Sequence, residues 1–138
     1  MKKMLITSAT MLLLAGTAHA GEAGDLAQAH IDAIAAGDVA AITSVYGEGA
    51  TLNWVGGPLD GMYEGDGLAE VWGKFTTAQT GLTATVSDLT ESTNDKGSTV
   101  VANVVFANAN TIPVRYVMTF RGGELVNEIW QIDPSLAQ

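Results

Sequence analysis

The periodicity of the apolar residues changes at Leu82, and this change constrains the fold more than any other feature. Before Leu82, outside a short alternating stretch at residues 50–55, the apolar side chains recur every three or four residues, and after it they alternate with polar ones along the chain. The first pattern is typical of amphipathic helices and the second of half-buried strands. Helices followed by a run of strands indicate an α+β domain, with the helices packed on one face of a curved antiparallel sheet.

The first half predicts three helices. One covers Asp25 to Ala36 and ends at Gly37, and its His30 shares a face with apolar neighbours four residues away on either side. A second is capped by Asp38 and runs to about Tyr46. The third begins near Asp66, and its apolar residues have the spacing of a single buried stripe: Leu68, Val71, Trp72 and Phe75.

A short strand over Ala50 to Val55 precedes a segment dense in glycine, which lies between Trp54 and Trp72. Its Gly-Pro and Asp-Gly pairs are turn signals, so the segment leads the chain from the strand into the third helix. Two interpretations remain open. The segment is either a plain connection or the rim of a pocket whose walls include the two tryptophans.

Three turns divide the second half into four strands of an antiparallel meander: residues 94–97, 109–110 and 122–123. If residues 109–110 form a two-residue turn, Tyr116 lies opposite Asn103. If residues 94–97 form a four-residue turn, Asn103 lies opposite Asp88. Residues that face each other in an antiparallel pair point to the same side of the sheet. We therefore expect one polar row of these three side chains on the concave face, with His30 above it.

The opposite face of the predicted sheet is also apolar. In the same register its members are Val104, Phe106, Val117, Trp130 and Ile132. A sheet that is apolar on both sides needs a cover on both sides, and the helices can supply only one. This pattern predicts a homodimer that forms through the back of the sheet.

The first twenty residues read as a secretory signal peptide. Lys2 and Lys3 precede an apolar run that ends in the small-residue pattern Ala18-His19-Ala20. We expect cleavage after Ala20 and an exported product, periplasmic or secreted, in which residues 21–138 form one domain. His30 is then the only histidine, and the chain contains no cysteine with which to form disulfides.

The charge balance excludes some partners. Without Lys2 and Lys3 the chain has four basic and fifteen acidic side chains, a net charge of −11 that repels phosphate backbones. Nucleic acid is therefore not an expected partner, and neither is a membrane after signal removal. No metal site or other cofactor is expected, because the acids of the glycine-rich region are not joined by a histidine or a second ordered carboxylate group: Glu48, Asp60, Glu64, Asp66 and Glu70.

The order of these elements resembles the nuclear transport factor 2-like superfamily and, within it, the SnoaL-like domains. The segments that carry the resemblance most clearly are AAGDVAAITSVYGEGATLNWVGGPLDG and GELVNEIWQID. The resemblance covers residues 21–138. It implies a cone, also called cystatin-like, in which a curved sheet wraps around the N-terminal helices and leaves a pocket at the open end. Relatives include ketosteroid isomerases, polyketide cyclases, dehydratases and binding proteins without catalysis, so the fold transfers and the function does not.

Matched residue by residue, the isomerase pattern is only partly present. The position of the general-base aspartate on the first strand is Trp54, which accepts no proton. The position of the oxyanion tyrosine on the first helix is His30, and Tyr116 matches the acid partner of the oxyanion site. The resemblance therefore implies altered donors and an absent base.

Two functions follow as alternatives. The first is an exported, non-catalytic pocket for a small apolar or aromatic molecule, lined by large and polar side chains: Tyr46, Trp54, Trp72, Asn103 and Met118. The second is a small acid–base enzyme of the isomerase, dehydratase or cyclase type that uses His30, Tyr116 and Asp88. Activity that depends on His30 would show a pH limb near the pKa of that imidazole, whereas binding of a neutral ligand requires none.

Overall fold

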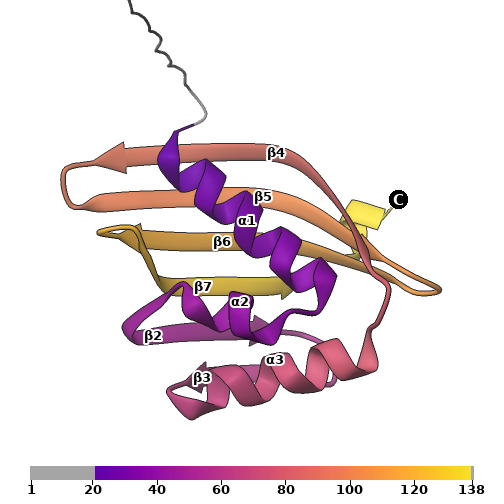
Figure 1. Ribbon diagram of the computed structural model, residues 1–138. Coiled ribbons are helices and arrows are strands. Elements are labelled where there is room, and N and C mark those ends of the chain that lie inside the picture. Colours follow the sequence, from indigo (N-terminus) through magenta and orange to yellow (C-terminus); the bar gives the residue numbers. More distant parts are fainter. Residues whose placement is uncertain (1–20, 138) are drawn as a thin grey trace, which may run out of the picture.

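Three helices lie on one face of a curved, six-stranded sheet (Figure 1). The computed structural model describes residues 21–137, and the predicted signal peptide lies outside the described residues. The α+β fold expected from the change of periodicity at Leu82 is confirmed. The helices and the concave side of the sheet enclose the core, so the opposite side of the sheet is called the outer face below.

The first two helices begin and end close to the predicted residues. Helix α1 (Glu22–Ala36) starts three residues earlier than expected and ends at Gly37, whose φ of 71° is left-handed. Helix α2 (Val39–Ser44) has the predicted cap, since the Asp38 side chain accepts a hydrogen bond of 3.1 Å from the backbone N–H of Ala41. It ends before Tyr46, which instead begins a strand.

Helix α3 (Asp66–Ala78) carries the predicted stripe. Its N-cap is Gly65 rather than Asp66, and no side chain caps it. All four members of the stripe are buried: Leu68, Val71, Trp72 and Phe75. The 3.6-residue spacing therefore identified the face of this helix that meets the core.

The sheet has the order β3-β2-β7-β6-β5-β4. The predicted meander is confirmed and consists of β4 (Thr83–Asn94), β5 (Gly97–Ala107), β6 (Thr111–Arg121) and β7 (Glu124–Ile132). Strand β2 (Tyr46–Val55) pairs in parallel with β7, and the short β3 (Gly61–Glu64) adds an antiparallel edge that the sequence pattern did not predict. A 3-10 turn, η2 (Pro134–Ala137), follows β7 and contacts β6.

The predicted register between β5 and β6 is wrong by one residue. Ala107 pairs with Thr111, so the connecting loop has three residues instead of two. Asn108 organises this loop, because its side-chain oxygen accepts from the N–H of Asn110 at 2.8 Å while its own N–H donates to the Asn110 carbonyl at 2.9 Å. A shift of one residue turns every side chain of the neighbouring strand to the other face.

Two β-bulges change the register further. In β7, Phe120 pairs with Leu125 but Thr119 pairs with Asn127, so Val126 is the extra residue. In β4, Ser87 pairs with Asn103 and Thr90 with Val101, so two residues lie opposite one. The first of the two, Asp88, has a left-handed φ of 52°.

Because of the three-residue loop and the bulge at Val126, the side chains of β5 and of most of β7 point to the opposite side of the sheet from the one predicted. Side chains assigned above to the outer face are fully buried in the core: Val104, Phe106 and Trp130. The assignment of these three residues to a dimer surface is therefore wrong. Strand β6 has the expected orientation, with Val114, Met118 and Phe120 toward the helices.

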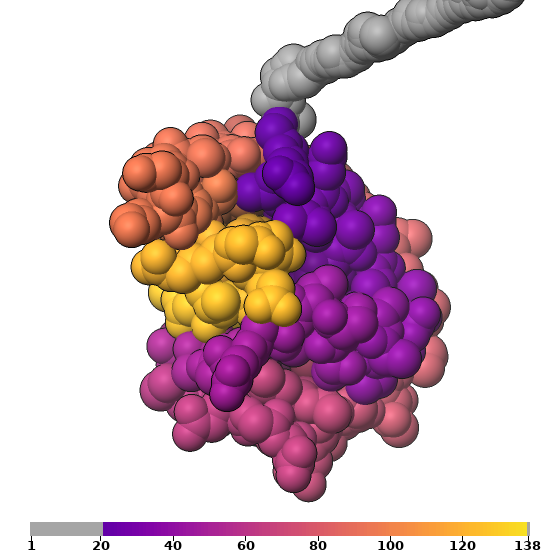
Figure 2. Space-filling view, turned by 60° about the vertical axis from the view of Figure 1, so that its left-hand side comes forward, coloured from indigo at the N-terminus to yellow at the C-terminus, as the bar shows by residue number. Residues whose placement is uncertain are grey.

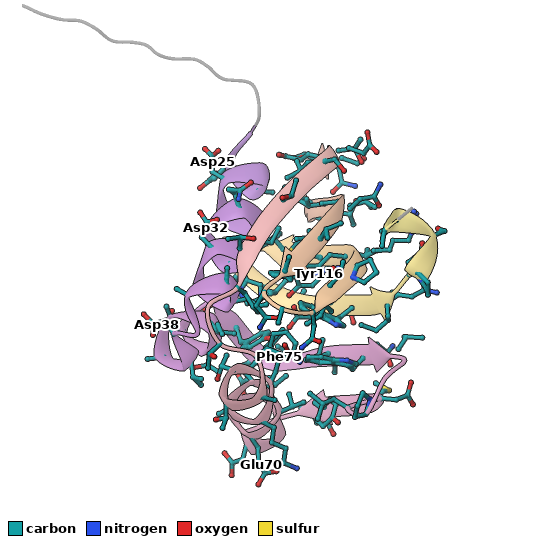
Figure 3. All side chains as sticks on the ribbon, turned by 90° about the vertical axis from the view of Figure 1, so that its right-hand side faces the viewer. Asp25, Asp32, Asp38, Glu70, Phe75 and Tyr116 are labelled. Carbon is teal, nitrogen blue, oxygen red and sulfur yellow. The ribbon has the colours of Figure 1, made fainter. Side chains whose placement is uncertain are left out.

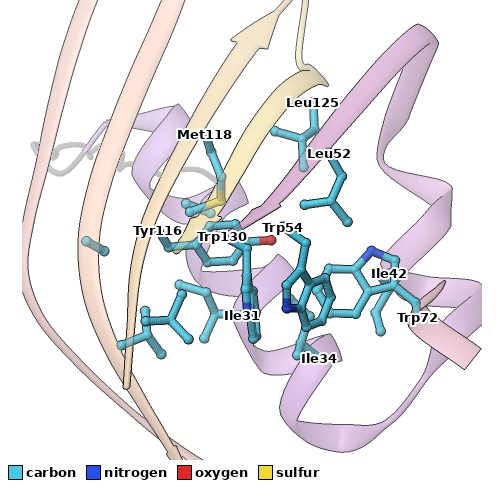
Figure 4. Packing of buried hydrophobic residues seen from close by; sticks show 14 of the residues in the cluster. Ile31, Ile34, Ile42, Leu52, Trp54, Trp72, Tyr116, Met118, Leu125 and Trp130 are labelled. Carbon is cyan, nitrogen blue, oxygen red and sulfur yellow. The ribbon is translucent and has the colours of Figure 1, made fainter. Parts of the chain in front are cut away.

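Aromatic rings fill the middle of the core (Figure 4). Trp130 lies at the centre of the group, with ring centroids 4.8 Å from Trp54 and 5.1 Å from Phe106, on which it stacks. In Figure 3, Phe75 and Tyr116 lie between the helices and the sheet, whereas labelled acids of the helices point outward. Complete burial of a single large aromatic side chain contributes about 2–3 kcal/mol, so this group accounts for much of the hydrophobic stabilisation.

Candidate functional site

A buried carboxylate, Glu128 on β7, is the polar centre of the core. Its residue is 0% exposed, and it lies among apolar side chains. A buried carboxylate is costly unless hydrogen-bond donors surround it. Glu128 has three such donors, which come from three different elements of the fold.

The three donors divide between the two oxygens of the carboxylate. Tyr116 donates its phenol hydrogen to Oε1 of Glu128, and Tyr46 donates to Oε2. The Nε2 atom of His30 lies 3.3 Å from Oε1. We call these four residues the Glu128 centre.

A fifth residue extends the Glu128 centre to the third helix. The indole Nε1 of Trp72 donates to the Tyr46 phenol oxygen over 2.7 Å. A continuous chain of hydrogen bonds therefore runs from Trp72 on α3, through Tyr46 at the start of β2, to Glu128 on β7. Hydrogen bonds that follow one another in this way polarise and strengthen each other.

Local features of the chain explain how these groups meet. The early end of α2 makes Tyr46 the first residue of β2, which lies next to β7 in the sheet. The bulge at Val126 turns Glu128 toward the core, since Leu125 and Glu128 are both buried although three positions separate them. His30 comes from the face of α1 that was expected to be buried.

Both phenols of the Glu128 centre hold their protons firmly. Burial, and then the adjacent Glu128 carboxylate, raises the pKa of Tyr46 and that of Tyr116 well above the ordinary value for tyrosine. Each phenol therefore acts as the donor and Glu128 as the acceptor. The arrangement resembles a solvation shell built from side chains in place of water.

Two buried nitrogens have no hydrogen-bond partner among the described residues. They are Nδ1 of His30 and Nε1 of Trp130. The first belongs to the Glu128 centre, and the second lies in the aromatic group beside it. Tyr116 connects the two, because its ring centroid is 6.1 Å from that of His30 and 5.2 Å from that of Trp130.

The Glu128 centre has the components of an acid–base site but is closed. A carboxylate, a histidine and two phenols can hold and move protons. His30 is 1% exposed, and Glu128 and Tyr116 are 0% exposed. No substrate atom reaches the carboxylate while this packing lasts.

The predicted catalytic residues do not form one group. The structure brings His30 and Tyr116 together on Glu128, but Asp88 is exposed on the outer face. Asn103 lies there too, opposite Arg115, and donates to the Asp88 carboxylate over 3.1 Å. The predicted row of Tyr116, Asn103 and Asp88 is therefore wrong, because the three-residue loop after β5 reverses that strand.

An apolar hollow of about 230 Å³ opens at the C-terminal end of α3. Its walls are mostly hydrophobic and include Trp54, Leu59, Phe75, Ile112 and Ile132, with Ala78 and Lys74 from α3. Of the five residues predicted to line a pocket, Trp54 borders this hollow. Trp72 and Met118 lie within the core, Tyr46 in the Glu128 centre and Asn103 on the outer face.

The glycine-rich segment forms part of the rim of this hollow. Gly56 and Gly57 lie on it, together with Pro58 and Leu59. Gly56 has a φ of 101°, and a Cβ there would lie 3.3 Å from Cβ of Ile132. A side chain at this position would therefore strain the backbone and press on the hollow, which is a physical reason for a glycine.

A second, larger hollow lies at the opposite end of the sheet, where α1 begins beside the β4–β5 and β6–β7 turns (Figure 2). It measures about 630 Å³, and its lining includes the acids Glu22, Glu91 and Asp95 together with Lys96.

Across residues 21–137, no three histidine or acidic side chains are grouped in a way that could hold a metal ion. Within the same residues, no helix has the length and hydrophobicity needed to cross a membrane.

Sequence reasoning missed Glu128, the central residue of the site. In the predicted register it lay on the outward face of the last strand, together with Val126, Trp130 and Ile132. The signal that was available is its position two residues before Trp130, because one face of a strand carries both residues. If Trp130 is buried because of its size, Glu128, which points to the same side of the strand, must be buried as well.

Comparisons with known proteins identify the fold family. Residues 27–127 match the model of the SnoaL-like domain. A nuclear transport factor 2-like protein of unknown function in nutrient uptake from Rhodospirillum rubrum is 14% identical, with a TM-score of 0.66 over 82% of this chain and 99% of that one. A cystatin-like protein of unknown function from Nostoc punctiforme is 16% identical, with a TM-score of 0.67 over 81% and 89%.

A third similar structure has a suggested activity. It is a nuclear transport factor 2-like protein from Streptomyces avermitilis named as a proposed dehydratase, 12% identical with a TM-score of 0.69 over 80% of this chain and 93% of that one. No curated protein matches the sequence. At these identities the structures show the fold alone. Since the family model covers most of the described residues, the chain belongs to the SnoaL-like domain family, and its fold is that of nuclear transport factor 2-like proteins.

Proposed function

We propose that this SnoaL-like domain binds a small apolar or aromatic molecule in the hollow at the end of α3, without catalysing a reaction. The observation that carries the proposal is the composition of this hollow, where Trp54, Phe75 and three aliphatic side chains surround about 230 Å³. Sites for small molecules are concave and mostly apolar. The volume is below the roughly 300 Å³ at which sites for drug-sized ligands begin, so a ligand of one or two rings fits best.

The position of the acid–base groups supports binding rather than catalysis. Trp54, which stands where related isomerases have a general base, forms part of the wall of the hollow. The residues that could move protons lie in the closed Glu128 centre instead. The alternative enzyme with His30, Tyr116 and Asp88 has its third member on the other side of the sheet.

A matched pair of variants tests the proposal with naphthalene as the probe. Ala78→Trp places an indole in the hollow, whereas Thr77→Trp adds the same ring at the adjacent exposed position that does not line it. We expect naphthalene to shift the methyl resonances of Ile112 and Ile132 in the wild type and in Thr77→Trp. The Ala78→Trp variant should bind at least about tenfold more weakly, which corresponds to roughly 1.4 kcal/mol. Wild-type protein whose hollow methyls do not respond to naphthalene would refute the proposed site.

We also propose a homodimer that forms through the outer face of the sheet, with a surface that differs from the one predicted from the sequence. The strand pairs Met62–Asn53, Asn53–Ile129, Ile129–Val117 and Val117–Val101 form one row across the sheet. Met62, at its end, is 67% exposed. A second copy related by a twofold axis would cover this largely apolar row.

Sedimentation equilibrium at micromolar concentration tests the dimer. Val117→Asp should give a monomer, because it places an unpaired charge in the contact, whereas Thr77→Asp on α3 should leave the dimer intact. A wild-type protein with the mass of a monomer would remove the dimer. Trp130→Asp is not an informative variant, since Trp130 is 0% exposed within one chain.

Export remains part of the proposal. The basic start, the apolar run and the Ala18-His19-Ala20 pattern support cleavage that leaves Gly21 as the first residue. N-terminal sequencing of protein from the exported fraction should begin at Gly21. Intact Met1 on that protein would contradict the expectation.

A further inference from the structure

We propose that Tyr46 is a positioning residue for the apolar hollow, through which the buried Glu128 carboxylate fixes the shape of a binding site that it does not touch. The inference rests on the proposed binding function. It assigns a purpose to the Glu128 centre, which the binding function leaves unexplained.

The first step is the double role of the Tyr46 phenol. It donates to Oε2 of Glu128 and accepts from Nε1 of Trp72 at 2.7 Å. A hydroxyl group has one hydrogen to donate and lone pairs with which to accept. Since the hydrogen points to Glu128, a lone pair faces the indole. The carboxylate therefore sets the direction in which Tyr46 can accept a hydrogen bond.

The second step leads from Trp72 to the hollow. The Trp72 indole is 0% exposed, and its ring centroid lies 5.2 Å from that of Trp54 and 5.8 Å from that of Phe75. Both neighbours line the hollow, but Trp72 does not. Trp72 therefore packs behind Trp54 and Phe75 on the side away from the hollow. A rotation of its ring would move both of these side chains because the interior is closely packed.

The third step is the difference between the Tyr46 and Tyr116 phenols in their hydrogen-bond partners. Tyr116 also donates to Glu128, but no hydrogen bond connects its phenol with α3. Loss of either hydroxyl removes one donor from the carboxylate. Only the loss at Tyr46 also leaves the buried Trp72 N–H without its acceptor, and an unpaired buried donor drives a rearrangement toward a new partner. Tyr46→Phe and Tyr116→Phe are therefore a matched pair.

The experiment compares the two variants by three measurements. These are hydrogen exchange of the Trp72 indole N–H, the methyl resonances of Ala78, Ile112 and Ile132, and the affinity for naphthalene. In Tyr46→Phe we expect exchange faster by at least about tenfold, displaced methyl resonances and affinity reduced by roughly fivefold or more. In Tyr116→Phe we expect all three measurements to stay near the wild type, even where its stability falls.

The first two measurements need no ligand, so they separate this inference from the proposed function. If wild-type protein does not bind naphthalene, the function fails, while the indole exchange and the methyl resonances still decide the linkage. Unchanged values in Tyr46→Phe, or equal changes in Tyr116→Phe, would overturn it. If Tyr46→Phe does not fold, Trp72→Phe replaces it, because this variant keeps the Tyr46–Glu128 bond and removes the indole donor. It should displace the same methyl resonances, and undisturbed resonances would again overturn the inference.

Discussion

The two faces of the sheet each carry a carboxylate bonded to a neighbouring side chain, but in opposite surroundings. On the core side, Glu128 is 0% exposed and has three donors. On the outer face, Asp88 is exposed and accepts from Asn103 at 3.1 Å. Water can replace the donor of Asp88 but cannot reach Glu128. Burial, more than the type of group, therefore decides how much such a contact contributes to stability.

The sharpest test of this comparison is Glu128→Ala. The substitution leaves two buried phenols and a histidine without their acceptor, and it opens a cavity in the core. We expect the free energy of unfolding to fall by about 3–5 kcal/mol. Equilibrium unfolding in urea measures the change.

Glu128→Gln is the control for shape. The amide fills the same volume and keeps a carbonyl acceptor, so a loss of about 1–3 kcal/mol is expected. If Glu128→Ala is as stable as the wild type, the Glu128 centre contributes nothing and the contrast between the faces disappears.

Because the pKa values of the Tyr46 and Tyr116 phenols are raised in the folded chain, we expect the free energy of unfolding to fall at high pH. Burial and Glu128 raise the pKa of both Tyr46 and Tyr116 in the folded chain above the unfolded value near 10. Below about pH 10 the folded and the unfolded chain both hold these protons, so the contribution is complete. Above it the unfolded chain loses them first, and each phenol lowers stability by up to about 1.4 kcal/mol per pH unit.

Urea unfolding between pH 8 and 11 measures this slope, with tyrosine absorbance as a second signal. Tyr116→Phe should remove about half of the slope that the two phenols produce. Phenols that ionise near pH 10 in the folded protein, before it unfolds, would contradict the prediction.

The smallest effect is expected on the outer face. Asp88→Ala removes an exposed hydrogen bond and places alanine at a φ of 52°. These changes together should lower stability by no more than about 1–2 kcal/mol. Asp88→Gly, which suits the left-handed backbone, should recover part of the loss. An Asp88→Ala effect as large as that of Glu128→Ala would break the comparison between the faces.

The sequence predicted the elements well and the strand register less well. The stripe from Leu68 to Phe75 identified the buried face of α3, because helical periodicity is a local property. The β4–β5 turn was also right, since Thr93 pairs with Ser98 as expected. The three-residue loop was visible in principle, because the asparagine at position 108 is a turn residue.

The bulge at Val126 had no such signal. Neither Val126 nor its neighbours contain the glycine that marks many bulges, and the extra residue is defined by pairing with β6. Register errors accumulate across a sheet, so the candidate site was the least predictable part. The burial of His30 was predictable because its helix face could be read locally, whereas the burial of Glu128 depended on a partner strand.

The parallel pairing of β2 with β7 has a consequence for the order of folding. Thr51 and Asn127, which meet in this pair and share a side-chain hydrogen bond, are 76 residues apart in the chain. Closing so large a loop is entropically unfavourable until other contacts hold its ends together. The hairpins of β4 to β7 can form early from neighbouring residues, but Tyr46 meets Glu128 only when β2 docks. The polar centre is therefore completed late, and a chain that has formed it has already closed the long loop between β2 and β7.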